Sequence, residues 1–169
     1  MGTRNLTMVR LNGKIRVAQY CQWDGYPTGQ GAVIARFIQN ELNLEVFKDK
    51  VKVLRLADNA MQDASWIDCG ASPDSEGVNL DVLDYHAVIY PEFSRDTGAE
   101  ILGLIQAGCV SHVKLDIDLL KAKWVCEYAY CIDLNKKTVE LYHGSIKPIK
   151  IIPFIKFTPE YMLTLENEL

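Results

Sequence analysis

The 169-residue sequence predicts a single α+β domain with a mainly antiparallel sheet, and three observations support this prediction. One hairpin pattern opens the chain, a second lies towards its C-terminal end, and segments with helical spacing separate the two. The composition agrees, because 49% hydrophobic and 24% charged residues are typical of a globular domain rather than a disordered chain. We therefore expect one hydrophobic core built from residues 1–169.

The first hairpin joins two strand-like segments through Asn12 and Gly13. This pair favours a tight type I′ turn, in which both central residues adopt positive φ. With such a turn, Val9 lies opposite Arg16, and the rest of the register follows from that pair. Residue parity then assigns to the core face the side chains of Leu6, Met8, Ile15 and Val17.

Helices are expected between the hairpins. Apolar residues recur at helical spacing over residues 33–42, and less clearly over residues 44–56. Thr97 and Glu100 form a capping-box pattern ahead of another apolar run, and Gly108 is a typical residue to end that helix. The chain therefore alternates between strand-like and helix-like stretches, as an α+β fold requires.

The remaining segments are assigned by composition. Residues 58–84 are acidic and rich in small residues, which predicts a loop-rich surface excursion within the one domain. Residues 85–90 suit a short buried strand, and residues 123–142 alternate as the second hairpin. An apolar stretch over residues 149–157 and a short helix after Pro159 complete the chain.

Charge is distributed unevenly along the chain, whose formal net charge is −4. Residues 1–57 carry nine basic and four acidic side chains, whereas residues 58–110 carry one and ten. The acidic balance argues against duplex nucleic acid as a partner, because such binding depends on clustered Lys and Arg. The basic N-terminal third can attract a small anion, although solvated helix faces are the commoner cause of such a skew.

Several other classes are disfavoured. No apolar run approaches the roughly 18 residues that span a membrane, and we expect a cytoplasmic protein with no membrane contact. Three scattered histidines and the lack of a C-x-x-C pair predict neither a metal site nor a disulfide framework. The odd number of cysteines fits a reducing compartment: Cys21, Cys69, Cys109, Cys126 and Cys131.

A glycine-rich loop is the densest functional signal. Gly25, Gly29 and Gly31 precede a predicted helix, where backbone N–H groups and the helix dipole favour a phosphate or carboxylate. Their spacing matches neither the Walker loop nor the dinucleotide G-x-G-x-x-G pattern, so no bound cofactor is expected. The loop therefore suggests an anion site without identifying the anion.

Aromatic and polar residues around this loop suggest how a nucleotide-like ligand would bind. Tyr20, Trp23 and Tyr26 offer flat surfaces for stacking, and Arg4 offers a forked donor to phosphate. For each residue alone, hairpin packing or a simple turn is the commoner explanation; the cluster as a whole favours function. The full candidate site contains Thr3, Arg4, Asn5, Tyr20, Gln22, Trp23, Asp24, Tyr26, Gly29, Gln30, Gly31, Arg95 and Asp96.

Three segments resemble one protein family. They are residues 1–7 (MGTRNLT), residues 19–31 (QYCQWDGYPTGQG) and residues 94–99 (SRDTGA). Together they resemble a family of uncharacterised phage and prophage proteins, and the first is also similar to fungal hypothetical proteins. The resemblance implies an accessory phage protein in the host cytoplasm, a group that includes proteins which bind or destroy nucleotide signals of host immunity.

Three functional hypotheses remain. The leading one is a binding protein that sequesters a small anionic ligand, such as a cyclic nucleotide or an ADP-ribose derivative. The second is a hydrolase similar in layering to the N-terminal-nucleophile enzymes, using Thr3, Cys21 or Asp24. Cys21 is more simply an inert buried thiol, and it stands where the family is expected to have a small residue. The third is a module that binds a host protein through the acidic excursion, and a homo-oligomer is compatible with all three.

Overall fold

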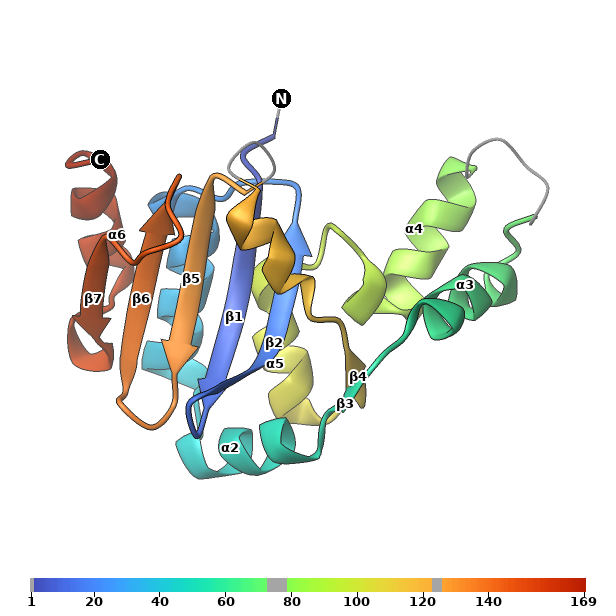
Figure 1. Ribbon diagram of the computed structural model, residues 1–169, viewed down its shortest axis with the longest axis horizontal. Coiled ribbons are helices and arrows are strands. Elements are labelled where there is room, and N and C mark those ends of the chain that lie inside the picture. Colours follow the sequence, from blue (N-terminus) through green and yellow to red (C-terminus); the bar gives the residue numbers. More distant parts are fainter. Residues whose placement is uncertain (1, 73–78, 123–125) are drawn as a thin grey trace.

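The computed structural model describes residues 2–72, 79–122 and 126–169, which form one mixed sheet with helices packed mainly on one face (Figure 1). The sheet order is β2-β1-β5-β6-β7. Its strands are β1 (Asn5–Leu11), β2 (Lys14–Cys21), β5 (Tyr128–Asp133), β6 (Thr138–His143) and β7 (Lys150–Pro153). Only β1 and β5 run parallel; the other three neighbouring pairs are antiparallel. The expected α+β class with a mainly antiparallel sheet is confirmed.

Helical segments cover the back of the sheet as seen in Figure 1. They are η1 (Pro27–Gly31), α1 (Ala32–Arg36), η2 (Phe37–Glu41), α2 (Leu44–Val53), α5 (Ile101–Ala107) and α6 (Pro159–Glu166). Their apolar side chains meet the sheet around the fully buried Phe47, Tyr130 and Phe157. Burying side chains of this size contributes about 1.5–3 kcal/mol each, so this layer is the main core.

A smaller apolar cluster lies on the opposite face. Leu6 and Met8 of β1 pack there with Ala18 of β2 and Cys131 of β5, under the short helical segment η5 (Asp116–Lys121). Nearer the turn of the first hairpin this face of the sheet is charged rather than apolar, because Arg10 contacts the carboxylates of Asp133 and Glu140. Both faces of the central strands are therefore covered.

The first hairpin keeps its predicted turn but not its predicted register. Asn12 and Gly13 have φ of 51° and 76°, as the type I′ turn requires. A bulge between Val9 and Arg10 then shifts the pairing by one residue, so Val9 lies opposite Val17 rather than Arg16. The predicted core face was wrong for the same reason, since Val17 packs under the helices while Leu6 and Met8 face the other way.

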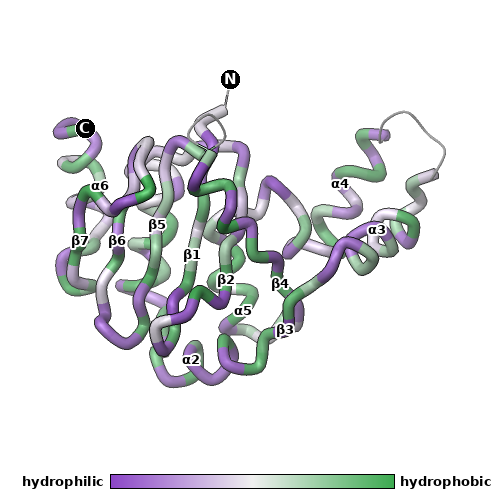
Figure 2. Tube along the Cα trace, viewed as in Figure 1, coloured by the Kyte–Doolittle hydropathy of each residue, from purple (hydrophilic) through white to green (hydrophobic). Residues whose placement is uncertain are grey.

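The acidic segment forms a helical arm rather than the predicted loop-rich excursion. Helices α3 (Asn59–Asp68) and α4 (Leu80–Ile89) project beside β2, as Figures 1 and 2 show. Both begin at side-chain caps, because Asp58 accepts a bond from the Met61 amide at 2.8 Å and Asn79 accepts one from the Asp81 amide at 3.0 Å. The buried strand predicted over residues 85–90 was also wrong, since most of it belongs to α4. Residues 73–78 lie outside the described part.

A two-stranded parallel ribbon joins this arm to the rest of the fold. It pairs β3 (Arg55–Leu56) with β4 (His112–Val113). The short helical turns η3 (Pro91–Phe93) and η4 (Gly98–Glu100) then return the chain from α4 to α5. The arm is therefore tied to the body at both of its ends.

Two local predictions about helix ends have different outcomes. Gly108 ends α5 in the left-handed region, with φ of 77°, as expected. The capping box was wrong, because the Thr97 hydroxyl donates to the Pro91 carbonyl at 2.6 Å instead of capping the helix. The loop before α5 is thus held by a contact to η3, which matters for the site described below.

The C-terminal half follows the sequence prediction closely. The second hairpin is formed by β5 and β6, and α6 begins at Pro159 with the Thr158 side chain as its cap. Residues 123–125, part of the first arm predicted for that hairpin, lie outside the described residues. Within the described ranges, none of the helices combines the length and the apolar character needed to cross a bilayer.

Candidate functional site

Two sequence motifs that are about 70 residues apart meet at the end of β2. The Gln22 side-chain oxygen accepts a hydrogen bond from the Arg95 guanidinium at 2.8 Å, and the Gln22 amide donates to the Arg95 carbonyl at 3.0 Å. The Trp23 indole donates to the Asp96 carboxylate at 2.6 Å. Four of the predicted site residues are therefore neighbours, and they bind one another.

A third contact locks the same two loops together. The Gln30 side-chain oxygen accepts a hydrogen bond from the Ala99 amide at 2.8 Å. Gly98 lies beside it with φ of 50°, and a Cβ added to Gly98 would lie 2.5 Å from that oxygen. Glycine is required here both by the backbone conformation and by the close approach of Gln30.

The buried members of the predicted site hold the loop in place. The Asn5 amide group donates to the Trp23 carbonyl at 2.9 Å, and the Thr3 carbonyl accepts from the Gly25 amide at 2.9 Å. The hydroxyl of the fully buried Tyr130 donates to the Gly25 carbonyl at 2.9 Å. These bonds give Thr3 and Asn5 a positioning role in the fold.

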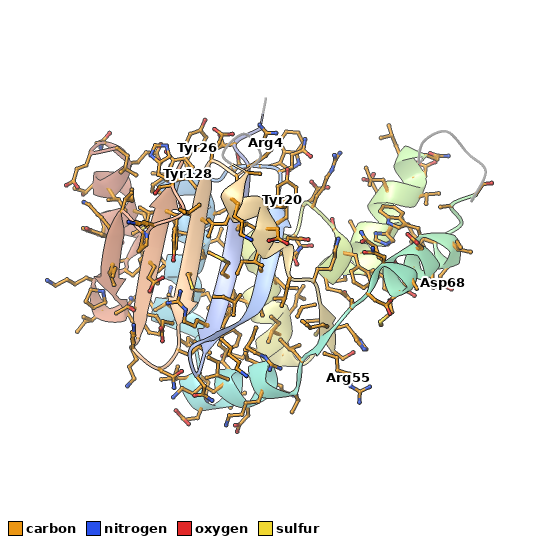
Figure 3. The ribbon with its side chains drawn as sticks, in the orientation of Figure 1. Arg4, Tyr20, Tyr26, Arg55, Asp68 and Tyr128 are labelled. Atoms are coloured by element: carbon orange, nitrogen blue, oxygen red, sulfur yellow. The ribbon has the colours of Figure 1, made fainter. Side chains whose placement is uncertain are left out.

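The glycine amides do not form an open anion cradle. The amides of Gly29 and Gly31 donate to the Tyr26 carbonyl at 3.0 and 3.3 Å, and the Gln30 amide donates to the Asp24 carbonyl at 2.7 Å. The backbone donors that the sequence analysis assigned to phosphate are thus used within the loop, which turns back on itself. The Tyr26 ring lies against Tyr128, with 6.0 Å between the ring centroids (Figure 3).

Cys21 has the environment of an unreactive thiol. Its side chain is buried, and burial raises the pKa of the thiol, with the nearby carboxylates of Asp24 and Asp96 adding to the effect. Its Sγ atom lies 3.5 Å from the Trp23 carbonyl oxygen, to which the thiol donates. A nucleophilic cysteine requires the opposite, a lowered pKa next to a base or a positive charge.

A cavity of about 240 Å³ opens beside this double loop, between β2 and the α3–α4 arm (residues 59–89). Tyr20 and Arg95 of the predicted site line it, so the sequence identified part of its wall. The Gln19 side chain spans from β2 to the Ser94 carbonyl at 2.9 Å and closes one side. The other lining residues are Gln62, Trp66, Leu83, His86, Glu92, Phe93, Lys114 and Asp116.

The cavity combines cations with carboxyl groups that resist ionisation. Lys114 donates to the Gln62 side-chain oxygen at 2.9 Å and lies 3.7 Å from the Asp116 carboxylate. Burial raises the pKa of Asp116 and also that of Glu92, in both cases as the largest effect. Lys114 is therefore paired within the cavity wall, and Arg95 at the rim is the second cation of the cavity.

His86 stiffens the arm side of the cavity. Its ring stacks on Trp66 with 3.5 Å between centroids, and its Nε2 atom lies 2.8 Å from the Ser65 hydroxyl. That hydroxyl donates to the Gln62 carbonyl at 2.6 Å, so it accepts from Nε2–H. The buried Nδ1 atom has no hydrogen-bond partner among the described residues, which favours the neutral imidazole. Burial lowers the pKa of His86, which agrees with this assignment.

This buried imidazole predicts a pH effect on stability. Below about pH 6.5, His86 is protonated in the unfolded chain more readily than in the folded protein. The free energy of unfolding therefore decreases as the pH falls, by at most about 1.4 kcal/mol per pH unit. We expect the urea midpoint of the wild type to drop more between about pH 7.5 and 5.5 than that of His86→Phe. Equal drops would show that His86 is protonated when folded. The comparison isolates the contribution of His86 to stability. The raised pKa values of Glu92 and Asp116 stabilise the folded state as the pH falls, and this effect is present in both proteins.

Comparison with known proteins adds no assignment: no protein-family model matches the chain, and neither a curated protein nor a solved structure is similar to it. Within the described ranges, no group of three or more His, Cys, Asp or Glu side chains is arranged to hold a metal ion.

The sequence analysis missed most of the cavity wall. The buried His86 lies beside Tyr20 and Arg95, which no sequence pattern indicated. Glu92 belongs to η3, whereas Lys114 follows β4 and Asp116 begins η5, and no sequence motif links the two segments. The available signal was the acidic stretch, whose helical caps at Asp58 and Asn79 would have predicted the arm.

Proposed function

We propose that the protein binds a small anionic, nucleotide-derived ligand in the cavity between β2 and the α3–α4 arm. One observation carries the proposal: an aromatic ring and two cations, Tyr20, Arg95 and Lys114, line a single cavity of about 240 Å³. That volume lies just below the range of about 300–1,000 Å³ that is usual for small-molecule sites, so a polymer is a poor fit. The two motif loops support the site by holding Arg95 at its rim.

The lining residues suit the parts of such a ligand. Tyr20 and Trp66 offer ring surfaces against which a base would pack, and Gln19 and Gln62 offer amide groups to its edge. Arg95 uses one N–H in its bond to Gln22, which leaves further donors of its guanidinium for a phosphate. The ligand class proposed from the sequence is therefore retained, but its proposed site is the cavity beside the glycine loop rather than the loop itself.

The electrostatics of the cavity fit a small anion better than an extended one. Arg95 and Lys114 supply two positive charges to the cavity wall, with Lys114 lying 3.7 Å from the Asp116 carboxylate and Glu92 on the same wall. Beyond the cavity the arm is acidic, which would repel a long polyanion. The resemblance to phage proteins extends the proposal to a role: sequestering a nucleotide signal of host immunity.

Calorimetry with AMP, a cyclic dinucleotide and ADP-ribose tests the binding proposal. We expect at least one of these probes to bind with a dissociation constant below about 100 μM. Arg95→Gln should weaken that binding at least about tenfold, because the variant keeps a side-chain donor towards Gln22 but loses the charge. Arg55→Gln is the matched control, since Arg55 is exposed and lies away from Tyr20 and outside the cavity (Figure 3).

The outcomes separate the alternatives. Absence of binding by all three probes, or equal weakening by Arg95→Gln and Arg55→Gln, would contradict the proposal. Binding that is abolished by Trp23→Ala and unaffected by Arg95→Gln would instead return the ligand to the glycine loop. These variants change exposed side chains, so a thermal melt of each is sufficient to confirm that the fold is kept.

A hydrolase is the second candidate. Its candidate catalytic groups are Glu92 and Asp116, whose pKa values are raised, rather than Thr3 or Cys21. Two carboxyl groups with raised pKa values in one cavity are suited to general acid catalysis. Thr3 and Cys21, by contrast, are buried in the loop packing. Recovery of each probe after incubation, analysed by mass spectrometry, distinguishes the two functions: turnover that Glu92→Gln removes without loss of binding would identify the hydrolase.

A further inference from the structure

The described part of the α3–α4 arm presents an acidic and apolar surface without Lys or Arg. The described residues of the arm and its first cap, 58–72 and 79–89, contain five acidic side chains and neither Lys nor Arg. On α4, Leu80 and Val88 are 73% and 76% exposed, and Tyr85 and Ile89 are also exposed, as is Ile67 on α3. Exposed apolar side chains grouped in this way on a projecting element are typical of a contact surface.

The opposite end of the molecule has the complementary composition. Residues 144–157 contain three lysines and no acidic residue. Ile151 of the edge strand β7 and Ile155 just after it are 61% and 84% exposed, and Ile146 and Ile149 are exposed nearby. We call this surface, residues 146–156, the β7 surface. In Figure 1 it lies at the far side of the sheet from the arm, and Figure 2 shows hydrophobic positions at both ends.

The lysines of the β7 surface differ in how far they are neutralised. Lys150 pairs with Glu168 at 2.5 Å. Within the described residues, no carboxylate lies within salt-bridge distance of the Lys147 or Lys156 ammonium groups. Two positive charges and a row of exposed isoleucines are thus left facing outwards. The unpaired backbone edge of β7 adds a further site for contact.

We propose that a second copy of this chain docks its acidic arm on the β7 surface, in a head-to-tail contact. Each surface supplies the charge that the other lacks, and both offer apolar area at the centre. Because the two surfaces lie at opposite ends of the molecule, one chain cannot pair its own arm with its own β7 surface. Pairing of two arms is disfavoured, because it would bring two acidic surfaces together.

The geometry determines the kind of assembly. A contact between two different surfaces leaves one arm and one β7 surface free after each addition. Association therefore continues until a ring closes, or gives open chains whose length grows with concentration. The test of the proposal does not depend on the ligand function, because the side chains that it changes, Leu80, Val88, Ile151 and Ile155, do not line the cavity.

Light scattering after size-exclusion chromatography tests the contact with two neutral double variants. Leu80→Gln/Val88→Gln removes apolar area from the arm, and Ile151→Thr/Ile155→Thr removes it from the β7 surface. We expect the wild type to exceed the 19.1 kDa of one chain as its concentration rises to about 500 μM. Each variant alone should stay monomeric, since every possible contact then lacks one intact surface.

Mixing the two variants provides the decisive result. The arm variant retains an intact β7 surface and the other retains an intact arm, so an equimolar mixture should form a dimer and no larger species. Val53→Gln, which changes a valine that is 72% exposed on α2, is the matched control and should assemble like the wild type. A monomeric wild type, assembly by either double variant alone, or a mixture that stays monomeric would each overturn the proposal.

Discussion

The Arg10→Met variant is expected to lose about 3 kcal/mol of folding free energy, because it leaves buried carboxylates without their cation. Arg10 donates to both oxygens of Glu140, at 2.6 and 2.9 Å, and approaches Asp133 at 3.4 Å. Glu140 and Asp133 are 7% and 3% exposed. The Arg10–Glu140 pair connects the N-terminal and C-terminal hairpins across the parallel β1–β5 junction.

The two charges of this pair also influence each other's titration. The bond to Glu140 raises the pKa of Arg10, and the bond from Arg10 lowers the pKa of Glu140. In Arg10→Met the Glu140 carboxyl loses this partner, and burial then favours its neutral form. We therefore expect the difference in stability between the variant and the wild type to shrink as the pH falls from about 7 towards 4.5.

Urea unfolding of the single and double variants measures this interaction. Arg10→Met/Glu140→Met removes both charges, and it should recover part of the loss, because no buried carboxylate is then left at that position. The recovery is incomplete because the buried Tyr142 hydroxyl loses its acceptor, the Glu140 carboxylate at 2.6 Å. The Asp133 carboxylate keeps its bonds from the amides of Asn135 and Lys136 at 3.1 and 2.9 Å. A double variant as unstable as Arg10→Met would show instead that the arginine acts mainly through packing.

Gly98→Ala is expected to cost about 2.5 kcal/mol, from two separate causes. A non-glycine residue in the left-handed region costs about 1–2 kcal/mol. The new Cβ would also displace the Gln30 side chain and break its bond from Ala99, which adds about 1 kcal/mol. For a chain of this size we expect the melting temperature to fall by about 8 °C.

Gly144→Ala is the matched control for this prediction. Gly144 has φ of 55°, close to that of Gly98, but its added Cβ would have no heavy atom within 4 Å. It should therefore show only the backbone cost, about 1–2 kcal/mol. Equal losses in the two variants, measured by thermal melting, would show that the contact between Gly98 and Gln30 contributes nothing to stability.

The features that the sequence predicted well are those determined by neighbouring residues. Asn12 and Gly13 specify the first turn, and Gly108 ends its helix, because each depends on the φ that one residue can adopt. The register of the first hairpin was missed, since the bulge at Val9 and Arg10 depends on packing against both faces of the sheet. The helices of the arm were missed because their apolar spacing is weak, although their caps are local.

The candidate site divides in the same way. The sequence singled out Tyr20, Trp23 and Arg95 because of their types, and the structure places all three at one end of β2. The sequence analysis proposed that backbone amides of the glycine loop bind phosphate. In the folded loop, these amides donate to carbonyl groups of the same loop. Which of these residues face a cavity depends on the position of the arm, which no local pattern specifies.

By itself, the sequence determined the α+β class, the two hairpins and their turns, because alternation of side chains and turn residues act over a few positions. Only the tertiary structure decided that β1 joins β5 in parallel, that residues 22–30 bind residues 95–99, and that the arm completes a cavity. Those pairings involve residues roughly 40 to 120 apart, whose meeting depends on how the whole chain packs and not on local preference.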